Sequence, residues 1–275
     1  KIMKKCPICN SECKKEVYFT FKCQKCNFIF SNLKPTTGRT VEGIENLRRK
    51  NFLSIIKHLK KIYKKNLNRK KILEIGSGDG YFVDECIKKK LKIYGSEANI
   101  KDYKILKKKY KNILFIRFPL KVKKNKFDLI IFNDVLEHLQ DLDLVIKQIK
   151  KLLKKDGMVI INLPNSDGVI YKISKILYSL NIKRFYNRLW QKNQASPHLS
   201  YFNKNNLNYL FKKYNFYKVL DTTLDSVDQK DNFKRINSTL NNKIISFLLA
   251  LFVFIFYFFQ KILPSDIILL FFRKK

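Results

Sequence analysis

The sequence predicts an α/β fold with a mostly parallel sheet and helices on both of its faces, preceded by a small metal-binding ribbon. Three observations support this prediction. From residue 71 onward, short apolar runs alternate with amphipathic stretches, which is the pattern of βαβ units. A glycine-rich turn follows the first of these runs. The 275 residues also suffice for one such domain and a short appendage, and they are too few for two enzymatic domains.

The elements of the main domain, residues 41–275, follow from residue periodicity. Apolar residues at helical spacing predict a leading helix over 41–63. Residues 168–200, rich in aromatic and basic side chains, interrupt the later order, and such an insertion after a sheet strand is a candidate lid. The remaining predictions are strands at 71–75, 91–96, 112–116, 127–132, 157–163, 215–222 and 265–272, and helices at 80–90, 101–110, 141–153 and 203–214.

Four cysteines near the N-terminus have the spacing of a structural zinc site. They form two CxxC pairs separated by thirteen residues, and such knuckles present four sulfurs tetrahedrally. The metal would supply the stability that a ribbon of residues 1–35 lacks. We expect a strand over 17–21 between the knuckles, and we interpret Cys13 as a spare thiol. The predicted ligands are Cys6, Cys9, Cys23 and Cys26.

A glycine loop follows the predicted strand 71–75. Gly76, Gly78 and Gly80 alternate there, and glycine lets the backbone turn tightly and approach a ligand without a Cβ in the way. A dinucleotide-binding loop would have its third glycine one residue later, where Tyr81 stands. The spacing therefore favours a nucleoside ligand without a pyrophosphate.

An acidic residue, Glu97, ends the second predicted strand, seventeen residues after Gly80. A carboxylate at this strand end can accept two hydrogen bonds from a ribose diol. The alternative is that Glu97 only caps the strand or the next helix. With the glycine loop ahead of it, we favour the ribose role.

Three segments resemble the class I S-adenosylmethionine-dependent methyltransferases. Residues 74–80 resemble the first motif of that family, residues 127–139 its fourth-strand motif, and residues 152–161 the stretch that leads into its fifth strand. The resemblance covers about residues 50–275 and implies a Rossmann-like, seven-stranded sheet.

The resemblance also implies how S-adenosylmethionine is held. The glycine loop would hold the methionine portion, Glu97 the ribose, and the fourth-strand end the region around the sulfonium. Many relatives carry an acid after the third strand for the adenine amino group, whereas this chain has 117–119 (Arg-Phe-Pro) there. The implied cofactor-binding residues are Glu74, Gly76, Ser77, Gly78, Asp79, Gly80, Glu97, Asn133, Asp134 and Val135.

The N-terminal ribbon bears on the acceptor. Together with residues 28–35, it resembles the ribbon of bacterial methyltransferases associated with sugar and surface-polysaccharide biosynthesis. A family of ribosomal-RNA base methyltransferases has a similar ribbon, but its last ligand is typically a histidine, and no histidine lies near Cys26. We therefore favour a saccharide, glycolipid or lipid-like acceptor over nucleic acid.

Two histidines are candidate catalytic groups. His138 follows the fourth strand, at the sheet edge that forms the cofactor crevice, although it could equally cap and pack the next helix. His198 follows the insertion, where relatives often have a histidine, and it is a candidate base or acceptor-orienting group. His58, on the leading helix, is expected at the surface. Asn162, Pro164 and Asn165, at the end of the fifth strand, could line the acceptor pocket.

Charge and hydropathy suggest a membrane partner. The net charge of +36 attracts polyanions such as acidic phospholipid or RNA, although a genome-wide compositional bias would explain it equally well. Residues 244–259 are almost wholly apolar, but a membrane-spanning helix needs about 20 residues. If 265–272 returns to the sheet, a single span is excluded. We expect 244–263 to dip into one leaflet, with a buried helix or a short span as alternatives.

The predicted function is methyl transfer from S-adenosylmethionine to a sugar, glycolipid or lipid-like acceptor at the cytoplasmic membrane face. We expect the chain to stay in the cytoplasm, because no apolar signal-peptide stretch precedes Cys6. The alternatives are an RNA methyltransferase and a non-catalytic binding protein of the same fold.

Overall fold

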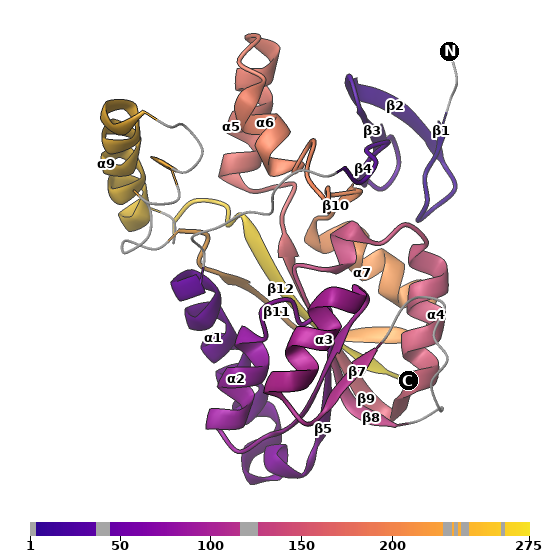
Figure 1. The fold of residues 1–275 in the computed structure, drawn as a ribbon. Helices are drawn as coiled ribbons and strands as arrows, with labels where there is room; N and C mark the ends of the chain where they lie inside the picture. The colour runs from indigo at the N-terminus through magenta and orange to yellow at the C-terminus, as the bar shows by residue number, and fades with distance from the viewer. Residues whose placement is uncertain are drawn as a thin grey trace.

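The main domain is built on a seven-stranded mixed sheet with the strand order β11-β12-β9-β8-β5-β6-β7 (Figure 1). The computed structural model describes residues 4–36, 45–115, 126–227, 233, 236–237, 242–259 and 262–275. The strands are β5 (Lys71–Ile75), β6 (Lys92–Glu97), β7 (Ile113–Phe115), β8 (Phe127–Asn133), β9 (Leu153–Pro164), β11 (Phe216–Leu224) and β12 (Ile267–Lys274). The predicted α/β fold with seven strands is confirmed.

Strand direction follows the predicted βαβ pattern except at the last strand. β5 lies parallel to β6 and β8, and Ile72 of β5 pairs with Leu129 of β8. β12 runs antiparallel to both β9 and β11, between which it is inserted. The carboxyl ends of the parallel strands therefore meet at one edge of the sheet, where ligands bind in folds of this type.

Helices cover both faces of the sheet because its strands are apolar on both sides. Successive residues of β5 belong to different cores: Ile72 packs in the cluster that holds Leu59, whereas Leu73 packs with Ile146 and Phe211. The first face carries α1 (Glu45–Tyr63), the 3-10 turn η1 (Lys64–Arg69), α2 (Tyr81–Lys88) and α3 (Ile100–Lys109), and the second carries α4 (Leu142–Leu152) and α7 (Lys204–Lys213) (Figure 1). The first four residues of the predicted leading helix, 41–44, lie outside the described residues.

The ribbon has its own five-stranded sheet, to which the main domain contributes a strand. Its strands are β1 (Lys4–Lys5), β2 (Glu12–Val17), β3 (Thr20–Cys23), β4 (Ile29–Ser31) and β10 (Ser200–Tyr201), in this order. The expected strand over 17–21 is wrong, because Tyr18 and Phe19 form the turn that joins β2 to β3. Tyr201 of β10 pairs with Ile29 of β4, and this pairing attaches the ribbon to the main domain.

The insertion packs on the ribbon through aromatic side chains. It contains α5 (Val169–Ser179) and α6 (Arg184–Leu189), which rise together beside the ribbon (Figure 1). Tyr186 and Trp190 are fully buried, with ring centroids 5.8 and 6.1 Å from that of Phe19. The Tyr186 hydroxyl also lies 3.1 Å from the Thr20 hydroxyl. The insertion and the ribbon thus share one core, so these contacts would oppose free lid movement.

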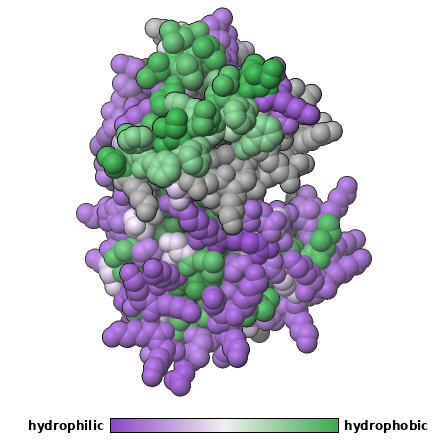
Figure 2. All heavy atoms as spheres, turned by 90° about the vertical axis from the view of Figure 1, so that its left-hand side faces the viewer, coloured by the Kyte–Doolittle hydropathy of each residue, from purple (hydrophilic) through white to green (hydrophobic). Residues whose placement is uncertain are grey.

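The apolar segment before the last strand forms helix α9 (Lys243–Phe259). In Figure 2 its side chains gather as a hydrophobic surface above a largely hydrophilic body. Phe247, Leu248 and Phe252 each keep about 60% of their surface exposed (62%, 59% and 61%). Among the helices that the structure describes, none has the length and apolarity needed to cross a membrane.

Candidate active site

The glycine loop leaves β5 with three residues in the left-handed region. The φ angles are 69° at Gly76, 49° at Gly78 and 81° at Gly80, which side chains with a Cβ rarely adopt. A Cβ at Gly76 would lie 2.7 Å from Cγ2 of Val135, so this glycine is also needed for close contact with the end of β8. A Cβ at Gly78 would meet no atom within 4 Å. The loop therefore faces open space at its middle glycine.

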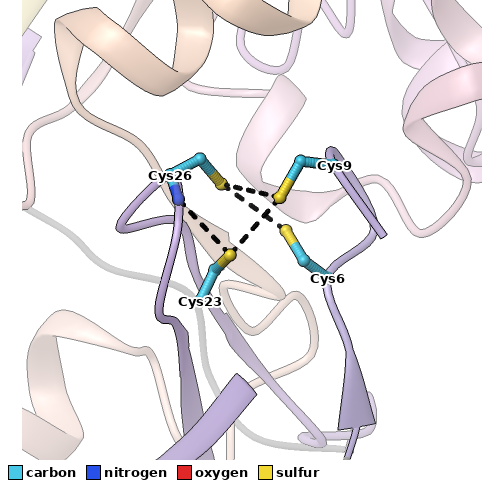
Figure 3. A group of neighbouring side chains, drawn as sticks. All are labelled: Cys6, Cys9, Cys23 and Cys26. Atoms are coloured by element: carbon cyan, nitrogen blue, oxygen red, sulfur yellow. Dashed lines mark hydrogen bonds between the residues drawn. The ribbon is translucent and has the colours of Figure 1, made fainter. Parts of the chain in front are cut away.

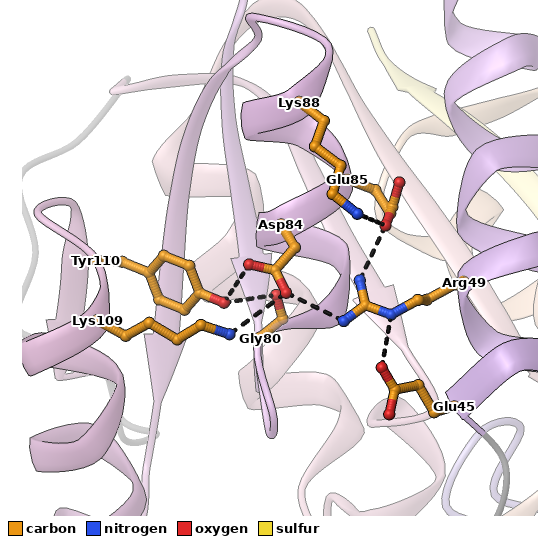
Figure 4. Close-up of polar contacts among 8 residues, drawn as sticks. All are labelled: Glu45, Arg49, Gly80, Asp84, Glu85, Lys88, Lys109 and Tyr110. Carbon is orange, nitrogen blue, oxygen red and sulfur yellow. Dashed lines mark hydrogen bonds and ion pairs between the residues drawn. The ribbon is translucent and has the colours of Figure 1, made fainter.

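A polar network holds the helix that follows the loop (Figure 4). The Tyr110 hydroxyl lies 2.6 Å from Oδ1 of Asp84 and 3.2 Å from the Gly80 carbonyl oxygen. The Arg49 guanidinium donates to Asp84 and Glu85 at 3.2 and 2.9 Å, which ties α1 to α2. These bonds hold α1 beside α2, and two residues of α1, Arg48 and Phe52, line the same cavity as the glycine loop.

Glu97 lies opposite the loop, at the end of β6. Its carboxylate accepts hydrogen bonds from the backbone N–H of Gly78 at 3.2 Å, Ala98 at 2.7 Å and Asn99 at 3.1 Å. The capping arrangement is present, since Glu97 caps the turn into α3 and also binds the glycine loop, whereas its ribose role stays a prediction. A carboxylate has about four lone-pair sites, so with three backbone hydrogen bonds this one keeps about one site for a ligand hydroxyl.

Glu74 is the buried member of the site. Its side chain accepts a 2.9 Å hydrogen bond from the Asn133 amide, which in turn accepts a 3.4 Å contact from the Asn162 amide. Burial raises the pKa of Glu74 to about 8, because the charged carboxylate loses its hydration. Asn162, predicted for the acceptor pocket, instead supports this network, and Asn165 binds the Ser265 carbonyl oxygen at 2.7 Å.

A cavity of about 130 Å³ opens between the ends of β5 and β8. All of the predicted cofactor residues line it except Gly80, which caps the N-terminus of α2, and Glu97, whose carboxylate accepts a hydrogen bond from the Gly78 N–H. The prediction missed three further lining residues: Arg48, Phe52 and Tyr81. Phe52 belonged to the apolar pattern of the leading helix, but periodicity alone does not tell where a helix packs. The expected adenine region at 117–119 lies outside the described residues.

The two predicted catalytic histidines are brought together beside this cavity. His138 ends the 3-10 turn η2 (Leu136–His138) after β8, and its backbone N–H donates to the Val135 carbonyl oxygen. The rings of His138 and His198 have centroids 4.7 Å apart, and burial lowers the pKa of both imidazoles. His58 lies elsewhere, on α1. Two neutral imidazoles next to a ligand cavity can accept a proton.

The four predicted metal ligands form one cluster in the ribbon (Figure 3). Sγ of Cys6 lies 3.6 Å from that of Cys26, and Sγ of Cys9 lies 3.4 Å from Cys23 and 3.6 Å from Cys26. A zinc ion with bonds of about 2.3 Å places its four sulfurs roughly 3.8 Å apart. The cluster therefore fits such an ion. Cys13 lies outside it, 3.7 Å from the Ser11 carbonyl oxygen.

Comparisons with known proteins agree with this geometry. A family model described as a methyltransferase domain matches residues 47–220. The fold is shared with an S-adenosylmethionine-dependent methyltransferase from Archaeoglobus fulgidus (16% identity, TM-score 0.52, covering 84% of this chain and 97% of that one). The chain therefore belongs to the methyltransferase domain family, and it is a class I S-adenosylmethionine-dependent methyltransferase.

Two further similar proteins are methyltransferases with named activities. Phosphoethanolamine N-methyltransferase 2 of Haemonchus contortus, solved with S-adenosyl-L-methionine, is 14% identical with a TM-score of 0.53, covering 81% of this chain and 52% of that one. The ubiquinone biosynthesis O-methyltransferase of Pelagibacter ubique (strain HTCC1062) is 35% identical over 103 residues, which are 35% of this chain. That match spans 43% of the relative's length.

Proposed function

We propose that this methyltransferase modifies a hydroxyl oxygen of a lipid-like acceptor, either a lipid or a saccharide carried on one, at a membrane surface. The observation that carries the proposal is the exposed apolar helix α9. It lies near the cofactor cavity, since Nζ of Lys50, between the cavity residues Arg48 and Phe52 on α1, is 5.6 Å from the Tyr257 ring of α9. The name of the ubiquinone biosynthesis relative, an O-methyltransferase, supports oxygen as the acceptor atom.

Different residues of the cavity would bind different parts of the cofactor. When bound, S-adenosylmethionine supplies an electrophilic methyl group on a sulfonium sulfur. The open space at Gly78 leaves room for its methionine portion, and Glu97 would accept hydrogen bonds from the ribose diol. Asp134 and Val135, at the end of β8, would lie beside the sulfonium. Arg48, 3.7 Å from Asp134, would close the cavity from α1.

The acceptor would enter on the histidine side of the cavity. Methyl transfer needs chiefly an acceptor oxygen held in line with the methyl group, and a base for the hydroxyl proton. His138 and His198 are the groups that we assign to orient the acceptor and receive this proton. His138 is held through Nδ1, which lies 3.0 Å from the Pro197 carbonyl oxygen.

Two apolar projections would hold the enzyme on the lipid surface. Besides α9, the tip of the insertion exposes Ile176 and Leu180, at 60% and 65%. A helix that is apolar on all sides exposes apolar surface to water at a cost in free energy, and a lipid interface would remove that cost by burying the surface. The net charge of +36 would add attraction to anionic headgroups.

Zinc in the cysteine cluster would have a structural role. Four thiolates leave no open position for a reactant, so the ion would stabilise the ribbon and, through Phe19, the packing of the insertion.

A transfer assay with a labelled methyl group tests the proposal. Zinc-loaded protein is incubated with labelled S-adenosylmethionine and vesicles that contain either an isoprenylated catechol or a lipid-linked saccharide. A water-soluble catechol and total RNA serve as competing acceptors. We expect the label to extract with the lipid acceptor into the organic phase and to withstand alkali, as a methyl ether does and a methyl ester does not. Label in RNA or in the water-soluble acceptor alone would contradict the lipid assignment and, for RNA, support the nucleic-acid alternative.

A further inference from the structure

Three potential metal ligands meet at the histidine side of the cavity. Glu137 and His138 lie in η2 after β8, and His198 lies in the segment before β10. One ligand atom from each side chain lies within 4.8 Å of the other two. The backbone fixes this approach, because the Leu199 N–H donates to the Glu137 carbonyl oxygen at 2.8 Å. The cluster is separate from the cysteine site in the ribbon.

The cluster contains buried polar atoms without partners among the described residues. Both carboxylate oxygens of Glu137, a residue only 1% exposed, make no hydrogen bond there, and neither does Nδ1 of the buried His198. Each such atom costs about 1–3 kcal/mol, and native proteins rarely keep several together unless an ion or water satisfies them. A bound cation would give these buried atoms a partner.

A neighbouring carbonyl group orients the His138 imidazole as metal ligands are usually oriented. Nδ1 of His138 lies 3.0 Å from the Pro197 carbonyl oxygen, so it carries the hydrogen and leaves the lone pair on Nε2. Nε2 of His198 lies 3.0 Å from the amide nitrogen of Gln191, so the ring accepts this hydrogen bond and carries its own hydrogen on Nδ1. Metal binding through Nδ1 of His198 would therefore require the Gln191 amide to turn, so that its oxygen accepts a hydrogen from Nε2.

We infer that Glu137, His138 and His198 form a binding site for a divalent transition-metal ion. Two imidazoles and one carboxylate are a ligand set that iron(II), zinc and manganese accept, and they leave coordination positions open. Metal bonds of about 2.0–2.2 Å place the ligand atoms roughly 3–3.5 Å apart, and the three ligand atoms here lie no more than 4.8 Å from one another. The site would carry a net charge of +1, since one carboxylate offsets half of the ion's charge.

This charge specifies the acceptor chemistry that the open positions favour. An oxygen anion, such as an ionised phenol or alcohol, completes the charge balance, and coordination to a cation favours loss of the hydroxyl proton. This part of the inference rests on the proposed transfer to a hydroxyl oxygen. The histidines would then hold the ion, which would take over from them the task of activating the acceptor.

Metal binding can be measured without any acceptor. The full-length protein, with its cysteine cluster saturated with zinc, is titrated calorimetrically with Mn²⁺, a hard ion that prefers nitrogen and oxygen ligands to thiolates. We expect one further equivalent to bind. Glu137→Gln and His198→Asn should each weaken binding at least 100-fold, and Gln191→Ala about tenfold because it removes only the support of His198. His58→Gln, the remaining histidine of the sequence, is the matched control and should bind as the wild type does.

A parallel titration with S-adenosylmethionine separates the two proposals. Variants that bind the cofactor normally are folded, so a loss of Mn²⁺ binding in them supports the metal site. Wild-type protein that binds the cofactor but takes up no Mn²⁺ at millimolar concentration would overturn the metal site and leave the histidines as bases. Equal Mn²⁺ binding by wild type, Glu137→Gln and His198→Asn would overturn it as well. Failure to bind the cofactor would instead count against the proposed function.

Discussion

The side-chain amide of Asn133 donates a 2.9 Å hydrogen bond to the buried carboxyl group of Glu74. This bond joins the ends of β5 and β8, the two strands between which the cofactor cavity opens. Because burial raises the pKa of Glu74 to about 8, the group is largely protonated at neutral pH in the free protein. The cavity thus holds a neutral acid that a cationic ligand would tend to ionise.

The first prediction concerns stability against pH in Glu74→Gln. Between the ordinary pKa of 4.5 and the folded value of about 8, the native state keeps a proton that the unfolded chain releases. Wild-type stability should therefore fall as pH rises through this window, by up to roughly 5 kcal/mol from this group alone. The variant lacks this contribution, so its stability relative to wild type should rise from pH 5 to pH 8 and then level off. Urea unfolding at several pH values measures this difference, and a constant difference would contradict the raised pKa.

Periodicity and glycine spacing were enough to predict the sheet and most of the cavity. Strand β5 has the predicted bounds, because a short apolar run that ends in Gly76-Ser77-Gly78 has few alternatives. Local pattern also fixed the position of Glu97 at a strand end. These features depend on neighbours along the chain, and a single sequence contains that information.

Contacts between distant segments were not predictable in this way. Nothing in the sequence indicates that Phe19 of the ribbon packs on Trp190, or that β10 joins the ribbon sheet. Glu137 was treated as part of a motif, and its approach to His198 depends on how the insertion returns to the sheet. Such contacts depend on how the elements pack in three dimensions. The sequence pattern of each element alone is compatible with many packing arrangements.

A second prediction tests the ribose assignment of Glu97. Replacing Glu97 with alanine removes acceptors for a diol and the hydrogen bond from Gly78, and hydrogen bonds to charged groups contribute about 1.5–3 kcal/mol each. Calorimetric titration should show at least tenfold weaker binding of S-adenosylmethionine, with Glu97→Gln between alanine and wild type. Asp102→Asn, an exposed acid on α3, is the control. Wild-type affinity in Glu97→Ala would mean that the residue only caps the strand.

A third prediction separates the two costs of a side chain at Gly76. An alanine there is strained at a φ of 69° and also places its Cβ 2.7 Å from Val135. Gly78→Ala, at a φ of 49° with no atom within 4 Å, bears only the backbone cost of about 1–2 kcal/mol. Urea unfolding should find Gly76→Ala less stable than Gly78→Ala. Adding Val135→Ala should recover part of this loss at Gly76 and none at Gly78. Equal stability of the two glycine variants would rule out the contact.

A fourth prediction assigns the metal of the ribbon. Elemental analysis should find one zinc per chain in the wild type and none in Cys23→Ser, because a hydroxyl is a poor ligand at a four-thiolate site. Since Tyr186 and Trp190 of the insertion pack on Phe19, we expect the near-ultraviolet circular dichroism of these aromatics to weaken as well. Cys13→Ser should keep both zinc and spectrum, because Cys13 lies outside the cluster. Loss of zinc in Cys13→Ser, or its retention in Cys23→Ser, would reassign the ligands.

The last prediction concerns the exposed helix α9. Leu248 and Phe252 lie one turn apart and are 59% and 61% exposed. Burying such a side chain in lipid contributes about 1.5–3 kcal/mol, and a glutamate there would also repel anionic headgroups. Leu248→Glu/Phe252→Glu should therefore reduce sedimentation with phosphatidylglycerol-containing vesicles at least tenfold. Ile105→Glu, on the surface of α3 and 66% exposed, should sediment as the wild type does.

Salt and vesicle composition separate the two attractions that this prediction combines. Lysine attraction to anionic lipid weakens as salt rises, whereas burial of apolar side chains persists. Wild-type protein should thus keep weak binding to neutral phosphatidylcholine vesicles, and the double variant should lose it. If α9 instead covers a second copy of the chain, the wild type should form dimers in size-exclusion chromatography and ignore vesicles, while the variant becomes monomeric. That outcome would replace the lipid surface by a protein interface and remove the main support for a lipid-like acceptor.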